Sequence, residues 1–318
     1  MPINSDKTHL WKKDIAESVD LFNKWFMKFA PAAYRDTRVK TTDDVREALR
    51  LTNDLHSITP ETLADNPSVL PVLRMSTAPP LARDRLIGLA YANKNLVLSM
   101  EERSKLPPKM AKDALQRDLK KICVILGTLV DREIFPWLEE SKAPTDAERY
   151  RASTIVADRL CGAVADPIVR NAQEQRQLKL IGEFLSARGY RQQQPSSGAA
   201  LTAMEPGTFA FRVNVPVGGG KATVNIPIDA VVQPKRRRKT RLPILIEAKS
   251  AGDFTNPNKR RKEEATKVNQ LKDTYGPGAS LVLFLCGYFD SGYLGYEAAE
   301  GIDWVWEHRI DDLLKLGI

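Results

Sequence analysis

Residues 227–249 read PIDAVVQPKRRRKTRLPILIEAK and hold two apolar runs on either side of a basic one. The second apolar run is uninterrupted almost to its end, which is typical of a strand covered on both faces. Arg238 lies midway between Asp229 and Glu247. Folded as an antiparallel hairpin with its apex at Arg238, the two runs therefore place Asp229 directly opposite Glu247.

These opposed carboxylates and a neighbouring lysine predict phosphodiester hydrolysis. Opposed strand residues have Cβ atoms about 5 Å apart, so Asp229 and Glu247 repel each other unless a cation binds between them. Mg²⁺ prefers such oxygen ligands, and the main-chain carbonyl of Ala248 is a further candidate ligand. Lys249 shares the strand face of Glu247, where it would orient water or neutralise charge on the phosphate. The alternative interpretation is a salt bridge at a strand end.

The basic residues gather around this motif. Residues 235–262 contain 11 lysines and arginines against two acidic residues, a net +9 in a chain whose total is +8. Such a window favours a polyanionic partner, although a solvated loop and a charged helix face would look the same. The candidate DNA contacts are Lys235, Arg236, Arg237, Arg238, Lys239, Arg241, Lys259, Arg260, Arg261 and Lys262.

Composition excludes several other classes of protein. With 318 residues and 42% hydrophobic residues, the chain buries at least one large core. It shows no membrane-spanning run and no signal peptide, which predicts a soluble, cytoplasmic protein. A disulfide framework, a zinc knuckle and a histidine-based nucleophilic triad are not expected, because the Cys and His residues are few and widely spaced. These residues are Cys123, Cys161, Cys286, His9, His56 and His308.

The pattern of elements changes partway along the chain. Residues 1–165 indicate helices separated by Pro-rich breaks, and we expect a mainly helical domain there, serving DNA recognition or dimerisation. Residues 166–318 begin with a helix over 173–187 and continue with strands, a helix and a further strand. The predicted fold class is α/β, with an α+β mixed sheet in the second domain.

The motif resembles that of a known nuclease superfamily. Asp229, followed by Glu247-Ala248-Lys249, resembles the PD-(D/E)XK signature. The surrounding sequence is similar to the XamI-type restriction endonucleases over roughly residues 168–318, and it includes the stretches VNIPIDAVVQPK and LPILIEAKSAGDFTN. One departure is that Ile228 separates the proline from Asp229.

The resemblance implies a Mg²⁺-dependent Type II endonuclease that cuts double-stranded DNA at a short palindrome, beside a cognate DNA methyltransferase. Asp229 and Glu247 would be metal ligands and Lys249 the catalytic lysine. A palindromic target favours a homodimer, because a two-fold site is matched by a two-fold protein. The rival hypotheses are a non-catalytic DNA-binding protein and a structure-selective repair or junction nuclease.

Two further site residues are suggested by their elements. Glu174 lies on the helix from which superfamily members often supply an extra acidic ligand, although a first-turn glutamate also favours the helix dipole. Gln270 follows the active strand on the next helix, where some branches place an active-site glutamine. An ordinary exposed glutamine would look the same.

Overall fold

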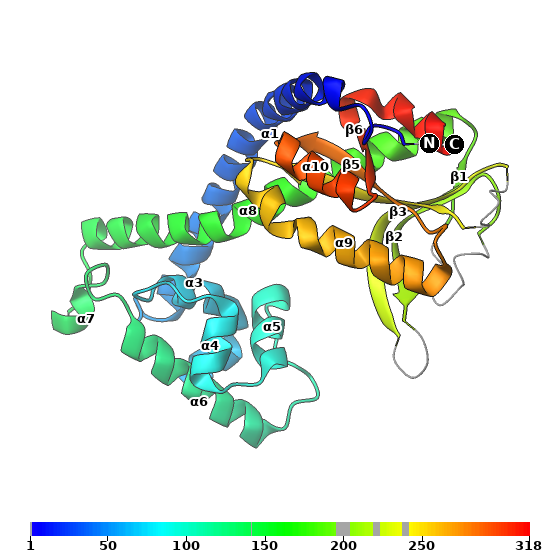
Figure 1. Ribbon diagram of the computed structural model, residues 1–318. Coiled ribbons are helices and arrows are strands. Elements are labelled where there is room, and N and C mark those ends of the chain that lie inside the picture. The colour runs from blue at the N-terminus through cyan, green and yellow to red at the C-terminus, as the bar shows by residue number, and fades with distance from the viewer. Residues whose placement is uncertain (1, 141, 195–203, 219–222, 237–241) are drawn as a thin grey trace. The chain divides into compact units, whose positions relative to one another are not determined.

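The computed structural model describes residues 2–140, 142–194, 204–218, 223–236 and 242–318. Within helix α9 (Thr255–Tyr275), the side chains of residues 256 and 258–261 are outside this description. A mainly helical part accompanies a six-stranded mixed sheet (Figure 1), so the predicted α/β fold class is confirmed. Among the helices described, none combines the length and apolar character that a membrane crossing requires.

The chain forms two compact units. One consists of residues 30–168, and the other joins residues 1–29 to residues 169–318. The expected functional division near residue 165 stays a prediction. The compact units differ from it chiefly in the first 29 residues, which belong with the sheet.

Two long helices correct the expected element boundaries. Helix α8 (Asp146–Ala187) is continuous through Pro167, and helix α1 (Thr8–Leu51) is continuous through Pro31. The helix expected over residues 173–187 is therefore the last part of a longer helix that begins at Asp146. An internal proline removes one main-chain hydrogen bond, a loss that both helices tolerate.

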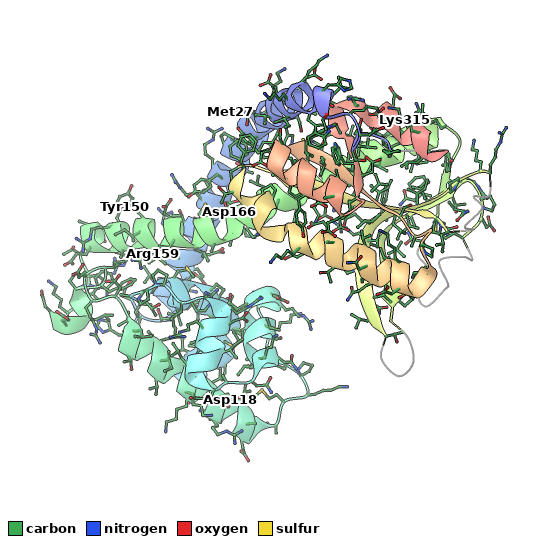
Figure 2. All side chains as sticks on the ribbon, in the orientation of Figure 1. Met27, Asp118, Tyr150, Arg159, Asp166 and Lys315 are labelled. Atoms are coloured by element: carbon green, nitrogen blue, oxygen red, sulfur yellow. The ribbon has the colours of Figure 1, made fainter. Side chains whose placement is uncertain are left out.

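The helical unit encloses a core of its own. Leu63, Phe135 and Trp137 are completely buried in it. Arg159, labelled in Figure 2, pairs with Asp131 at 3.2 Å and donates to main-chain carbonyls. Parts of α1 and α8 complete this unit, which also contains α2 (Pro60–Asp65), η1 (Pro67–Val69), α3 (Leu70–Met75), α4 (Arg83–Ala90), α5 (Lys94–Arg103), α6 (Lys112–Leu129) and α7 (Trp137–Glu140).

The sheet has its strands in sequence order. β1 and β2 are parallel, β2, β3 and β4 are successively antiparallel, and β4, β5 and β6 are parallel. Helices α9 and α10 (Ser291–Ala299) form the crossovers that the parallel strands require. The strands are β1 (Arg191–Gln192), β2 (Thr208–Val217), β3 (Val224–Gln233), β4 (Ile244–Ala251), β5 (Leu281–Gly287) and β6 (Asp303–Trp306).

Alternating side chains give the central strands two buried faces. Leu281, Leu283 and Leu285 pack in the cluster that includes residues of α9 and α10. Val282 and Phe284 pack in the cluster that includes α8 and the 3₁₀ helix η3 (Glu307–Leu316). Both faces of β4 and β5 are thus removed from water, which explains their uninterrupted apolar sequences.

The first residues of the chain complete the sheet unit. Ile3 is buried in the cluster of α8 and η3. Asn4 donates from its side chain to the Trp304 carbonyl at 2.9 Å, and the ring of Trp11 lies 5.6 Å from that of Trp304. Residues nearly 300 positions apart are therefore packed in one core.

Candidate active site

The β3–β4 register brings the predicted site together. The last paired positions of β3 and β4 are Ala230 and Ile246, and the next residues outward are Asp229 and Glu247, in agreement with a midpoint at Arg238. The two strands are also joined at the site, because the Ala248 main-chain N–H donates to Asp229 Oδ2 at 2.8 Å. The hairpin tip, residues 237–241, lies outside the described residues.

Helix α9 adds two charged side chains that sequence reasoning missed. Lys249 Nζ lies 2.8 Å from Glu264 Oε1 and 3.4 Å from Glu247 Oε1. Lys267 Nζ lies only 2.6 Å from the same Glu247 oxygen. Glu264 and Lys267 are three residues apart, which places them on one helical face. Glu264 continues the buried stripe of Val268, and a charge within an apolar stripe was the available signal.

The electrostatics of the strand residues follow from burial and from one another. Burial, followed by repulsion from Glu247, raises the pKa of Asp229 to about 6. Burial lowers the pKa of Lys249, but the carboxylates of Glu247 and Glu264 outweigh that effect and raise it overall. Lys249 is therefore an ammonium at neutral pH. Asp229 is partly protonated near pH 6 when no cation is bound.

Several buried carboxylate oxygens at this site have no hydrogen-bond partner among the residues that the structure describes. Glu247 Oε2 and Glu264 Oε2 are two of them, and both oxygens of Glu297 on α10 are two more. Burial, followed by repulsion from Glu264, raises the pKa of Glu297 to about 8. A buried carboxylate oxygen without a donor is costly. The unpartnered oxygen of Glu247 suits a hard divalent cation, which takes oxygen ligands.

The two secondary candidates differ in their surroundings. Glu174 is half-buried and pairs with Arg212 at 2.8 Å, and its charge contributes to the raised pKa of Asp229. Arg212 has a positive φ of 53° within β2, a conformation that L-residues rarely adopt. Gln270 is exposed and borders an open pocket of about 480 Å³, together with Lys262 and Lys267.

The basic residues of the window fall into three groups. Lys235 is held by two contacts within the protein. Its Nζ donates to the Arg188 carbonyl at 2.6 Å and lies 5.4 Å from the Tyr190 ring centre. Arg236 and Lys262 are exposed. Outside the described part are Arg237, Arg238, Lys239 and Arg241, and the side chains of Lys259, Arg260 and Arg261.

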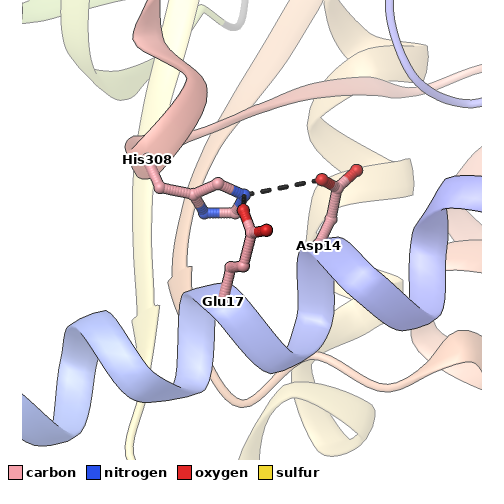
Figure 3. Close-up of side chains that lie close together, drawn as sticks. All are labelled: Asp14, Glu17 and His308. Carbon is pink, nitrogen blue, oxygen red and sulfur yellow. Dashed lines mark ion pairs between the residues drawn. The ribbon is translucent and has the colours of Figure 1, made fainter.

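A second group of potential metal ligands lies elsewhere in the sheet unit (Figure 3). Asp14, Glu17 and His308 have ligand atoms within 4.8 Å of one another. His308 Nε2 is 3.5 Å from Asp14 and 3.4 Å from Glu17, and burial lowers the pKa of His308. Arg309 already neutralises Asp14 at 2.7 Å. Linear spacing could not reveal this group, because its members are almost 300 residues apart.

Comparison with known proteins gives a consistent family assignment. The model of the XamI restriction endonuclease family matches residues 53–306. The Type II restriction enzyme SalI of Streptomyces albus G is 58% identical over 315 residues, covering 99% of each chain. The solved structure of protein VC1899 from Vibrio cholerae covers 80% of this chain and 55% of its own, at 12% identity and a TM-score of 0.29. That score is too low for a shared fold to be inferred.

Proposed function

The chain belongs to the XamI restriction endonuclease family, and from this premise we propose that it is a Type II enzyme that hydrolyses phosphodiester bonds of double-stranded DNA with Mg²⁺. The chemistry is supported by the β3–β4 register, which continues from Ala230 and Ile246 to Asp229 and Glu247, and by Lys249 at 3.4 Å from Glu247. An oxygen of Glu247 without a partner among the described residues favours a cation at this point.

We assign a separate role to each residue of the site. Asp229, Glu247 and the Ala248 carbonyl would hold Mg²⁺, with Glu174 as a further candidate ligand. When bound, the ion polarises a phosphoryl oxygen and lowers the pKa of water. Lys249 remains protonated between its two glutamates, so it would orient water and neutralise charge on the phosphate rather than remove a proton. The exposed Gln270 would contact the substrate.

Alanine substitutions test the metal ligands. Asp229→Ala and Glu247→Ala should each abolish Mg²⁺-dependent cleavage of plasmid DNA while DNA binding persists, because cation affinity falls and the basic surface is untouched. Asp273→Ala, which removes an exposed carboxylate from α9, is the matched control and should cleave normally. Undiminished cleavage by both site variants would refute the assignment.

The lysine is tested separately. Lys249→Ala should lower the single-turnover cleavage rate by orders of magnitude at saturating Mg²⁺, with DNA affinity changed by at most about one phosphate contact. Full activity restored by excess Mg²⁺ would instead make Lys249 a supporting residue. If wild-type protein binds DNA but never cuts it with Mg²⁺, the non-catalytic alternative is correct.

The partners follow from the same proposal. We expect the basic window to contact the DNA backbone, residues 1–165 to serve recognition or dimerisation, and the protein to act as a cytoplasmic homodimer on a palindrome. A cognate DNA methyltransferase would protect host DNA without binding this chain. Analytical ultracentrifugation with and without cognate duplex tests the dimer, and a monomer in both conditions would contradict it.

A further inference from the structure

The lysine closest to Glu247 belongs to α9 rather than to the strand motif. Lys267 Nζ lies 2.6 Å from Glu247 Oε1, compared with 3.4 Å for Lys249 Nζ. Lys249 is held more closely by Glu264, at 2.8 Å. The charge of Glu247 is therefore balanced chiefly by Lys267.

Lys267 contacts one oxygen of the carboxylate that a metal ion would bind. Mg²⁺ binds carboxylate oxygens at about 2.1 Å, so an ion on Glu247 would lie within a few ångströms of this ammonium. Two cations at such a distance repel strongly in a partly buried site. One of them has to leave, and Lys249 remains anchored by Glu264. Lys267 is the side chain that can move.

A pocket next to Lys267 can accommodate its side chain after it leaves Glu247. The Lys267 side chain is 23% exposed and borders an open pocket of about 480 Å³, whose other charged or polar lining residues are Asn225, Lys262, Glu263, Thr266 and Gln270. A lysine stem is long and flexible, with a rotatable donor group at its end. The two lysines offset the single carboxylate of this lining, and ammonium, hydroxyl and amide groups hold DNA phosphates without reading bases.

We propose that Lys267 is a positioning residue that serves as a removable counter-cation. It neutralises Glu247 while no metal is bound, moves away from that carboxylate when Mg²⁺ binds it, and then turns into the neighbouring pocket to hold a backbone phosphate of DNA. Cation binding and DNA positioning are coupled through this one side chain. The inference rests on the proposed function, since it assumes a metal ion on Glu247.

Metal binding in the absence of DNA tests the first part of the proposal, that Lys267 competes with Mg²⁺ for Glu247. Lys267→Met keeps the apolar stem but removes the competing charge, so calorimetric titration with Mg²⁺ should show affinity at least about tenfold tighter than wild type. Lys272→Met, on the same helix, should match wild type. Lys267→Gln is a second variant should the methionine variant fail to fold. Unchanged or weaker Mg²⁺ affinity in a folded variant would overturn the proposal.

Thermal unfolding separates this role from a purely structural one. Without metal, Lys267→Met should melt below wild type, because Glu247 is left buried without its cation. With saturating Mg²⁺ the deficit should shrink or reverse. An equal deficit in both conditions would show that Lys267 only holds α9 to the sheet, and would contradict the proposal.

Salt-dependent DNA binding tests the second half. The quantity to measure, with Ca²⁺ present, is the slope of the logarithm of the DNA-binding constant against the logarithm of the salt concentration. For Lys267→Met the magnitude of this salt slope should be smaller than for wild type by about 0.9, the value of one phosphate contact. An unchanged slope would refute the phosphate contact. Failure of the proposed function is recognised independently, because wild-type protein would then neither cleave with Mg²⁺ nor lose Mg²⁺ binding on Glu247→Ala.

Discussion

At Asp229, burial and the facing Glu247 raise the pKa from 3.8 to about 6. A carboxyl that holds its proton more tightly in the folded state makes stability fall as pH rises from about 4 to about 6. Asp229→Asn removes this titration. In EDTA, the variant should therefore gain up to about 3 kcal/mol over wild type between pH 4 and pH 7. Denaturant unfolding at several pH values measures the difference.

Added Mg²⁺ distinguishes a shared cation site from burial alone, because burial by itself also raises the pKa of a carboxyl. Added Mg²⁺ should stabilise wild type at pH 7 by binding the folded state, and stabilise Asp229→Asn much less. A stability difference that stays constant from pH 4 to pH 7 would mean that Asp229 is not strained by Glu247, and that the two carboxylates need no cation.

Residue identity at the site could be predicted only where strand geometry determines it. Asp229, Glu247 and Lys249 follow from the alternation of a strand and from one hairpin midpoint, and the pairing of Ala230 with Ile246 agrees with that register. The contacts of Glu264 and Lys267 depend on how α9 docks on the sheet. Docking is decided by packing across long sequence separations, which a single sequence does not display.

At the scale of elements, the basic run that follows β3 contains residues of different character. Lys235 and Arg236 are both exposed, but Lys235 also donates to the Arg188 carbonyl and lies beside the Tyr190 ring. If Arg236 contacts one phosphate, Arg236→Ala should lower the magnitude of the salt slope of DNA binding by about 0.9. Lys235→Ala should leave that slope nearly unchanged and lower the melting temperature instead. Fluorescence anisotropy against salt, with matched melting curves, compares the two.

Neutralising Arg236, Arg237 and Arg238 together extends this comparison. Phosphate contacts position DNA without reading its sequence, so the triple variant should lose cognate and scrambled duplex affinity alike and cut the same sequence. An unchanged salt slope would show that the run is a solvated loop. Relaxed specificity at one base pair would instead indicate that an arginine reads a guanine edge.

Helix boundaries were the least predictable feature of the elements. The apolar stripe of residues 173–187 is visible in the sequence, but α8 begins at Asp146 and passes through Pro167. Its two parts belong to different compact units, because the division of the chain falls between residues 168 and 169. A helix that changes its packing partner changes its buried face, so one amphipathic pattern cannot run along its whole length.

At the scale of the whole molecule, the sheet unit is discontinuous in sequence. Asn4 is 1% exposed and donates to the Trp304 carbonyl and to Asp312, and its own oxygen accepts from Arg309. The sequence offers no periodic pattern that would connect residue 4 to residue 304. Such contacts become visible only once the chain is folded.

The two cores should respond separately to mutation. Asn4→Ala leaves several buried polar partners unsatisfied, and should destabilise the sheet unit by about 2–4 kcal/mol. Leu63→Ala opens a cavity in the helical unit's core, where Leu63 is fully buried, at a cost of about 2–5 kcal/mol. Scanning calorimetry should resolve two transitions, each lowered by only one of these substitutions. Because Asp229 and Glu247 lie in the sheet unit, Mg²⁺ should raise only the transition that Asn4→Ala lowers. A single transition lowered equally by both would show instead that the units unfold as one.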